Sequence, residues 1–238
     1  MRLDNAVAVK FSLSRNKAQQ MIELSKVMLD GRICNKPAAE VKENSDISLI
    51  EPPSYASIGG EKLAKALSDF NFSVRDNICL DIGASNGGFT DCLLQNGAKQ
   101  VIAVDIGECA FDDRLKKDPR VIIKDKTNAR YLTTSDVPQT CDFACVDVSF
   151  ISLKLILPAV AALIRQGGHI IALVKPQFEV GRRHLSKSGI VVDVKARERV
   201  LVDISNYAVQ LGLEVKGSCT APIRERKNVE YLLLLNKI

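Results

Sequence analysis

The sequence predicts an α/β protein, in which a small α+β domain is followed by a doubly wound, mostly parallel seven-stranded sheet of the Rossmann-like kind. Two observations support this fold class. From residue 77 onward, short apolar runs alternate with helical stretches, which is typical of a parallel sheet covered by helices on both faces. The first fifty residues instead combine a short amphipathic helix with a turn and strand-like stubs. Two domains are therefore expected.

Composition excludes several classes of protein. The chain has 238 residues, 46% of them hydrophobic and 26% charged, so it can bury a sizeable core without disulfides or metal. No apolar run approaches the roughly 20 residues that span a bilayer, and the N-terminus lacks the apolar region of a signal peptide. We therefore expect a cytoplasmic protein with no stable membrane insertion.

The cysteines and histidines do not predict a metal site. The seven cysteines form no CxxC pair and several lie inside apolar runs, so buried reduced thiols are expected. His169 and His184 are the only histidines, and neither has a cysteine at ligand spacing. The net charge of +5 favours an anionic partner if the basic residues cluster.

The N-terminal domain is expected over residues 1–50, with a helix that starts after Ser14. Ser14 is an N-cap residue type, and the spacing that follows places Ala18, Ile22 and Val27 around one short amphipathic helix.

A hairpin and a further strand follow this helix. The Asp-Gly pair in "VMLDGRI" predicts a tight turn between two apolar stubs, and "VKENSDISLIEP" predicts another strand before two prolines break the chain. Residues 51–58 are then a linker, and residues 59–238 form the second domain.

The second domain opens with a helix in "GGEKLAKALSDF", which has Leu63, Ala66, Leu67 and Phe70 on one face. The strands "NICLD", "QVIAVD", "RVIIKD", "CDFACVD" and "HIIALVK" come next. Each ends in a charged residue, and in open α/β sheets the ligand binds outside this edge. A single aspartate after a strand usually caps the next helix, but five charged residues at one edge indicate a site. These residues are Asp81, Asp105, Asp125, Asp147 and Lys175.

The glycine-rich turn after the first of these strands discriminates between cofactors. A dinucleotide fingerprint needs G-x-G-x-x-G, but Ser85 stands where the second glycine belongs. Asp81 precedes the turn, where it would repel a phosphate and attract a cation. The pattern therefore favours S-adenosylmethionine, which carries an ammonium and a sulfonium group, over a nicotinamide dinucleotide. The expected cofactor residues are Asp81, Gly83, Ala84, Ser85, Asn86, Gly87, Gly88 and Phe89 at the methionine end, Asp105 and Ile106 at the ribose, and Asp125 and Lys126 over the adenine.

The last two strands differ from the others because only the short link "APIRERK" joins them. "LGLEVKGSCT" and "NVEYLLLLNKI" therefore form a hairpin rather than a crossover. An antiparallel strand inserted in a parallel sheet begins at the edge where its neighbours finish. Glu230 is accordingly expected to join Asp81, Asp147 and Lys175 in one crevice.

The residues near the strand ends favour a hydroxyl as the methyl acceptor. The chain has "DVSF" where methyltransferases of base amino groups commonly have D/N-P-P-Y, and Cys145 lies inside a strand rather than on an exposed loop. A hydroxyl acceptor needs help in losing its proton. Lys175 is the candidate, although a lysine pKa of about 10.4 must be overcome. Lys62 could supply a neighbouring positive charge. Two alternatives stay open: Lys175 as a structural ion pair with Asp147, and Lys62 as an ordinary surface lysine.

The first fifty residues resemble an S4 RNA-binding domain. The resemblance rests on R-L-D at the start, S-R-x-x-A at the helix, and V-x-L-x-G-x-x-x-x-K-P after it. A solvated basic face would explain the charges alone about as well. The resemblance implies an RNA-facing surface formed by Arg2, Arg15, Lys17, Lys26, Arg32 and Lys36.

Nearly the whole chain resembles the haemolysin A (TlyA) family. The motifs are "YASIGGEKL", "LDIGASNGGFTDCLLQNGAKQVIAVDIG", "CVDVSFISL", "LVKPQFEVG" and "NVEYL". The resemblance implies an FtsJ-like methyltransferase domain with a catalytic tetrad of Lys62, Asp147, Lys175 and Glu230. It also implies S-adenosylmethionine as cofactor, and 2'-O-methylation of a cytidine ribose in ribosomal RNA. Some members are also described as haemolysins.

Two positions depart from the family pattern. Ser57-Ile58-Gly59-Gly60 stands where the family often has Ser-Arg-Gly-Gly, and the basic run 224–227 replaces a glycine-containing loop. Arg182, Arg183 and Lys187 are also expected to flank the crevice and to follow RNA phosphates. The short start before R-L-D resembles the subgroup that acts on 23S rRNA only, so 23S rRNA is the expected substrate. The alternatives are a membrane-active haemolysin and an RNA-binding ribosome assembly factor with a vestigial cofactor pocket.

Overall fold

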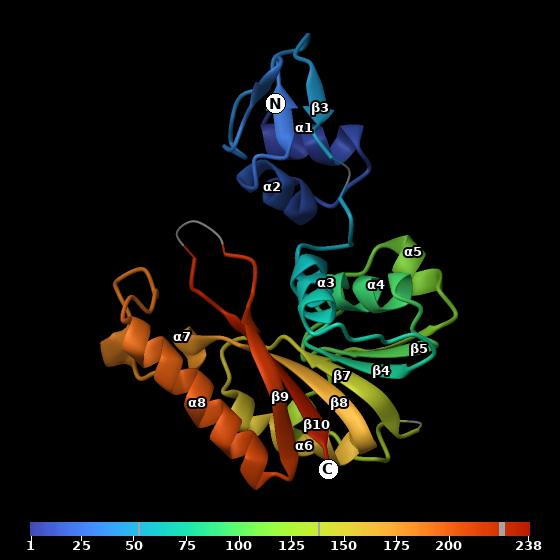
Figure 1. Ribbon diagram of the computed structural model, residues 1–238. Helices are drawn as coiled ribbons and strands as arrows, with labels where there is room; N and C mark the ends of the chain where they lie inside the picture. The colour runs from blue at the N-terminus through green and yellow to red at the C-terminus, as the bar shows by residue number, and fades with distance from the viewer. Residues whose placement is uncertain (52, 138, 224–226) are drawn as a thin grey trace. The chain divides into compact units, whose positions relative to one another are not determined.

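The computed structural model describes residues 1–51, 53–137, 139–223 and 227–238. Within it the chain divides into two compact units, Met1–Ile58 and Gly59–Ile238. Each unit has a buried apolar core of its own. The two units are drawn in Figure 1, where the smaller one is blue to cyan.

The smaller unit, here called unit 1, packs two helices against a three-stranded sheet. Its helices are α1 (Leu3–Lys10) and α2 (Arg15–Glu23), and its strands are β1 (Val27–Leu29), β2 (Arg32–Ile33) and β3 (Ile47–Leu49). The sheet order is β2-β1-β3, with both pairs antiparallel. The core is formed by Leu3, Ala6, Val7, Ala18, Met21, Ile22, Val27 and Ile47.

Local sequence explains the turn and the second helix of unit 1. Ser14 caps α2 by accepting a hydrogen bond from the N–H of Lys17, as the sequence predicts. Asp30 and Gly31 have φ of 50° and 74°, so both central residues of the hairpin turn lie in the left-handed region that a tight hairpin requires.

Two features of unit 1 differ from expectation. Val27 does not lie on the helix, because α2 ends at Glu23 and Val27 opens β1. Helix α1 is also unexpected, because its segment "LDNAVAVK" contains two β-branched valines with modest helix propensity. The burial of Leu3, Ala6 and Val7 in the core of unit 1 outweighs that propensity.

The larger unit, unit 2, contains the seven-stranded sheet that the sequence predicts. The strands are β4 (Ile78–Ile82), β5 (Gln100–Val104), β6 (Val121–Lys124), β7 (Cys141–Val146), β8 (Ile164–Val174), β9 (Leu213–Thr220) and β10 (Tyr231–Lys237). Their order is β6-β5-β4-β7-β8-β10-β9. The first five are parallel, and β10 is antiparallel to both of its neighbours. The fold is therefore doubly wound and mostly parallel.

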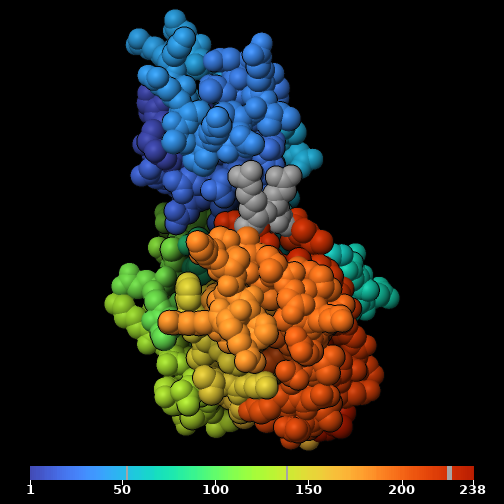
Figure 2. Space-filling model, turned by 90° about the vertical axis from the view of Figure 1, so that its left-hand side faces the viewer, coloured from blue at the N-terminus to red at the C-terminus, as the bar shows by residue number. Residues whose placement is uncertain are grey.

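Helices cover both faces of this sheet. One face carries α3 (Gly59–Asp69), α4 (Gly88–Gln95) and α5 (Asp113–Lys117), and the other carries α6 (Leu157–Leu163) and α8 (Val194–Gln210) (Figure 1). Short helices follow the strand ends: η1 (Ala129–Tyr131), η2 (Leu153–Leu155), α7 (Pro176–Glu179) and η3 (Arg182–His184). One side of α8 is exposed to solvent, and it is drawn orange in Figure 2.

Strand β8 is longer than the run "HIIALVK" suggests, because Ile164 already pairs with Cys141 of β7. Its other end determines the position of the candidate site. Tyr231 pairs with Val174, so Glu230 before β10 lies level with Lys175 after β8. Among the described residues, no helix is both long and apolar enough to cross a membrane.

Candidate functional site

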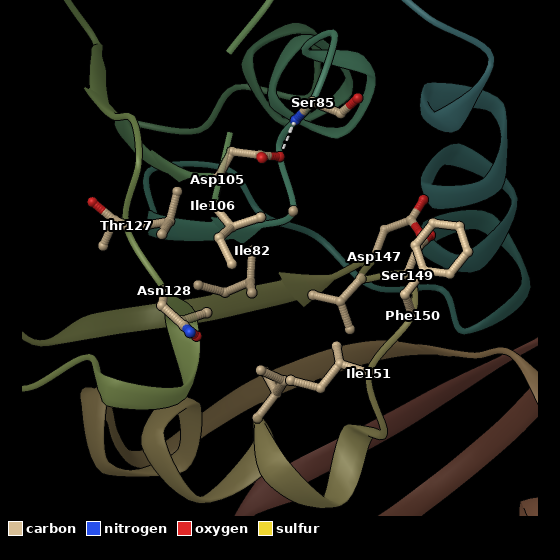
Figure 3. Close-up of a pocket in the computed structure, with 15 residues that line it drawn as sticks. Ile82, Ser85, Asp105, Ile106, Thr127, Asn128, Asp147, Ser149, Phe150 and Ile151 are labelled. Carbon is tan, nitrogen blue, oxygen red and sulfur yellow. Dashed lines mark hydrogen bonds between the residues drawn. The ribbon is translucent and has the colours of Figure 1, made fainter. Parts of the chain in front are cut away.

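A cavity of about 520 Å³ opens at the carboxyl ends of β4, β5 and β7. Ser85, Asp105, Ile106 and Thr127 lie on one side of it, and Asp147, Ser149 and Phe150 lie on the other (Figure 3). Its size is within the usual range for small-molecule sites, and most of its wall is apolar. The lining residues are Ile82, Gly83, Ser85, Val104, Asp105, Ile106, Thr127, Asn128, Ala129, Asp147, Val148, Ser149, Phe150, Ile151 and Ile156.

The glycine turn brings β4 close to β7 at this cavity. Gly83 has φ of 84°, and a Cβ at this position would lie 2.3 Å from the carbonyl oxygen of Asp147. Only glycine fits such an approach. At the other end of the turn, Gly87 has φ of 77° and precedes α4. The turn therefore depends on glycine both for its conformation and for its contact with β7.

Asp105 is held at the cavity wall by two backbone groups. Its Oδ2 accepts from the N–H of Ser85 at 2.8 Å (Figure 3), and its Oδ1 accepts from the N–H of Gly107 at 2.8 Å. A carboxylate oxygen can accept more than one hydrogen bond, so Asp105 retains capacity for a ligand hydroxyl. Ile106, which follows it, is 71% exposed and lines the same cavity.

Asp81 lies inside unit 2 rather than on the cavity wall. Its side chain is fully buried, and its Oδ2 accepts a 2.6 Å hydrogen bond from the hydroxyl of Thr90 on α4. Burial raises the pKa of its carboxyl to about 7. In the structure Asp81 links β4 to α4, and its contact with a cofactor ammonium stays a prediction.

Asp125 and Lys126, which are expected over an adenine, both have partners within unit 2. Asp125 accepts from the N–H of Cys109 at 2.6 Å, and this bond lowers the pKa of Asp125. Lys126 pairs with Glu108 at 2.8 Å. Neither Asp125 nor Lys126 lines the cavity, whose wall is formed here by the next three residues, Thr127, Asn128 and Ala129. The polar pair "TN", which follows Asp125 and Lys126 at the end of this strand, was the signal that could have identified them.

The remaining residues of the glycine turn do not line the cavity. Ala84, Gly87, Gly88 and Phe89 are buried, and Asn86 is half-buried. None of these five is among the residues that line the cavity. They shape the turn and the start of α4.

Four charged side chains distant in the sequence meet beside the cavity. Lys175 Nζ lies 2.5 Å from Asp147 Oδ1, and Lys62 Nζ lies 2.7 Å from Glu230 Oε2. Lys62 Nζ is also 3.9 Å from Asp147 Oδ2, so the two pairs form one cluster. The side chains of these residues are only 10% to 18% exposed. Lys62 is therefore not an ordinary surface lysine.

Asp147 belongs to both the cluster and the cavity, so the cluster lies beside the ligand space. Lys175 Nζ also donates to Ser149 Oγ at 2.9 Å. Sequence reasoning missed Ser149, which is an unremarkable residue type in "DVSF". Its position beside Lys175 depends on the parallel pairing of β7 with β8, which brings the loops after these two strands together.

Phe150 is the other site residue that sequence reasoning missed. Its side chain is 91% exposed at the cavity, and its φ of 64° is uncommon for a bulky residue. Its ring lies 5.0 Å from that of Phe178, measured between centroids. Exposed aromatic rings of this kind are surfaces on which nucleic-acid bases stack.

Glu179 connects the two loops that carry these residues. Its Oε2 accepts from the Ser152 hydroxyl at 2.6 Å, and its Oε1 accepts from the N–H of Leu153 at 2.8 Å. The loop after β7 is thus tied to the loop after β8 by a carboxylate as well as by the Asp147 and Lys175 pair.

The basic residues expected to face RNA in unit 1 have different environments. Lys17 is buried, and its Nζ donates to the backbone carbonyl of Tyr55, so it does not belong to an exposed basic face. Lys26 lies 3.9 Å from Glu51. Arg32 and Lys36 are exposed. Arg2 and Arg15 are partly exposed and both bind Asp4.

In unit 2, Arg182 and Arg183 form the exposed start of η3, and Lys187 is exposed after it. Residues 224–226 of the basic run lie outside the described residues.

Both units match known protein families. Residues 55–237 match the FtsJ-like methyltransferase family, and residues 1–47 match the S4 domain. The 16S/23S rRNA (cytidine-2'-O)-methyltransferase TlyA of Mycobacterium tuberculosis is 38% identical over 93% of this chain and 84% of its own length. Hemolysin A of Brachyspira hyodysenteriae is 37% identical over 98% of both chains. A solved structure described as "Putative hemolysin from Streptococcus thermophilus" is 42% identical, with a TM-score of 0.80 over 100% of this chain and 88% of that one.

Proposed function

Because the chain belongs to the FtsJ-like methyltransferase family, and within it to the haemolysin A (TlyA) proteins with an N-terminal S4 domain, we propose that it methylates the 2'-hydroxyl of a cytidine in ribosomal RNA. The proposed donor is S-adenosylmethionine and the proposed substrate is 23S rRNA. An rRNA substrate agrees with the cytoplasmic location that composition suggests.

The observation that carries this proposal is the cluster of Lys62, Asp147, Lys175 and Glu230. These residues come from α3, from the loops after β7 and β8, and from the residue before β10. A structural ion pair would need only two of them. Two lysines and two carboxylates beside a ligand cavity suit the positioning and deprotonation of a hydroxyl group.

The cavity fits S-adenosylmethionine. Asp105 is placed to accept hydrogen bonds from ribose hydroxyls, and Ile82, Ile106 and Ile151 offer an apolar surface to an adenine. Gly83 keeps the turn open, since any side chain there would meet Asp147. Bound S-adenosylmethionine supplies a methyl group that an oxygen nucleophile can attack in line.

The side chains of this protein would then act on the acceptor. Lys175, held by Asp147 and Ser149, steers the ribose hydroxyl or accepts its proton. Lys62 and Glu230 keep the carboxylate of Asp147 in place. Phe150 offers a ring on which the target base or its neighbour can stack, while Arg182 and Arg183 hold backbone phosphates.

We assign a separate role to each successive part of the chain. Residues 1–50 bind RNA as an S4 domain, residues 51–58 connect the domains, and residues 59–238 carry the cofactor and the chemistry. The match of residues 1–47 to the S4 domain supports the first assignment.

Substitution of Lys175 by alanine tests the proposal. We expect methyl transfer from radiolabelled S-adenosylmethionine to unmodified 23S rRNA to be abolished, while cofactor affinity by calorimetry stays within a few-fold. Lys99→Ala is the control, because Lys99 is exposed at the amino end of β5, the opposite edge of the sheet. Unchanged turnover of Lys175→Ala would remove the proposed role.

Calorimetry and a leakage assay on the wild-type protein separate the alternatives. No heat on titration with S-adenosylmethionine would indicate a vestigial pocket in an assembly factor. Leakage of liposomes by the purified wild-type protein, without methyl transfer, would support a membrane-active haemolysin instead.

A further inference from the structure

Unit 1 contains a buried carboxylate, that of Asp4, which forms ion pairs with two exposed arginines. Asp4 on α1 is fully buried, yet its partners Arg2 and Arg15 keep 46% and 55% of their side chains exposed. Arg2 stands at the N-cap of α1, and Arg15 is the first residue of α2. One carboxylate therefore joins basic residues at the amino ends of both helices.

The geometry fixes both guanidinium groups. Arg2 donates from Nε to Asp4 Oδ1 at 3.1 Å and from Nη2 to Oδ2 at 2.9 Å. Arg15 donates from Nε and Nη2 to Oδ2 at 3.2 and 3.1 Å. Gln19 Nε2 and the N–H of Asn5 complete the set at 2.8 and 2.9 Å. Asp4 is thus saturated with donors, and neither arginine can rotate without breaking two bonds.

The same bonds leave one end of each arginine available. Both arginines use Nε and Nη2 for Asp4, and within the described part of the chain no hydrogen bond involves either Nη1. The hydrogen bonds from Arg2 and Gln19 hold the pKa of Asp4 well below its usual range, so the carboxylate stays charged. Two half-exposed guanidinium groups are therefore held in a fixed arrangement at one place on unit 1.

We propose that Asp4 is a positioning residue that pre-organises Arg2 and Arg15 as a paired contact for RNA backbone phosphates. This inference rests on the proposed RNA-binding function of unit 1. An arginine that is ordered before binding loses less side-chain freedom when it meets a phosphate, and its planar group suits bidentate contact. Asp4 thus contributes to RNA binding without touching RNA.

Charge alone predicts the opposite effect for Asp4. A carboxylate beneath two arginines lowers the local positive charge, so its removal should strengthen binding to a polyanion if only charge mattered. Pre-organisation predicts that its removal weakens binding. The sign of the change therefore separates the two explanations.

The experiment compares Asp4→Asn with Glu23→Gln in the full-length protein. Both variants lose one negative charge from unit 1, and Glu23 is exposed at the end of α2. In filter binding to a 23S rRNA transcript, we expect Asp4→Asn to bind about fivefold more weakly than the wild type. Glu23→Gln should bind equally or more tightly. Asp4→Asn binding as tightly as Glu23→Gln would overturn the proposal.

A second pair of variants covers the case in which Asp4→Asn fails to fold, as judged by thermal melting. Arg15→Lys keeps the charge and loses the forked contact with Asp4, and it should weaken RNA binding several-fold. Arg75→Lys makes the same exchange at an exposed position before β4 in unit 2, outside the proposed RNA contacts, and should change binding by less than about twofold. Equal affinities of these two variants would also overturn the proposal.

Methyl transfer keeps this inference distinct from the proposed function. If the wild type methylates 23S rRNA and Asp4→Asn binds it normally, only the role of Asp4 is wrong. If the wild type neither binds nor methylates rRNA, the proposed function itself fails.

Discussion

At the scale of single residues, Gly83 is the position where conformation and close contact coincide. We expect Gly83→Ala to lose binding of S-adenosylmethionine, because the added Cβ would lie 2.3 Å from the carbonyl oxygen of Asp147. Gly212→Ala is the matched control, since Gly212 also has positive φ but nothing lies within 4 Å of its added Cβ. Both variants incur backbone strain of about 1 kcal/mol, and only Gly83→Ala adds a clash. Calorimetry with the cofactor distinguishes them, and equal affinities would contradict this prediction.

Asp81 should give the protein a measurable pH dependence. Its pKa is about 7 in the folded protein and about 3.9 in an unfolded chain, so the folded state binds more protons between these values. The contribution of Asp81 to stability is therefore present below about pH 4 and is lost as the pH rises to about 7, on the order of 4 kcal/mol in all.

Asp81→Asn removes this titration while keeping an acceptor for the Thr90 hydroxyl. Relative to the wild type, the variant should gain stability as the pH rises from 4 to 7, with a constant difference above pH 7. Urea unfolding at several pH values measures the difference. Parallel stability curves for the two proteins would contradict this account of Asp81.

At the scale of elements, the loops after β7 and β8 act as one support for the lysine-carboxylate cluster. Glu179 binds both Ser152 and Leu153 across the two loops, and Phe178 packs on Phe150. Glu179→Ala should therefore lower kcat by roughly tenfold through misplacement of Ser149 and Phe150. Cofactor affinity should change little, because Glu179 does not line the cavity.

Methyl-transfer kinetics on rRNA measure the effect of Glu179→Ala, with Glu198→Ala on the exposed side of α8 as the control. A normal kcat for the Glu179 variant would show that the loops hold their arrangement without this carboxylate.

At the scale of the whole molecule, each unit has its own core, so we expect residues 51–238 to fold without residues 1–50. The shortened protein should retain binding of S-adenosylmethionine and lose affinity for rRNA. Its affinity should also depend less steeply on salt, because the phosphate contacts of unit 1 are absent. The expectation is tested by measuring the affinity of both proteins for rRNA at salt concentrations from about 50 to about 200 mM and comparing how steeply each affinity falls. Equal affinity of the two proteins would assign unit 1 another role.

Much of this organisation could be predicted from the sequence alone. The alternation of apolar runs and helices predicts the sheet, and the charged residue at each strand end predicts its edge. Even the position of Glu230 followed from one topological rule, because a hairpin strand inserted among parallel strands must begin where they end. The pairing of Tyr231 with Val174 confirms this register.

The tertiary structure decided which strand-end residues reach the cavity. Asp81 and Asp105 both follow the same pattern at a strand end in the sequence. In the structure, Asp81 is buried and bound by the Thr90 hydroxyl of α4, whereas Asp105 is held at the cavity wall by two backbone N–H groups. Likewise, Lys17 is buried, whereas Arg15 two residues earlier is half exposed. A pattern along the chain determines where a strand or helix lies and where it ends. The direction and burial of one side chain depend on what packs over it, and those partners lie far away in the sequence.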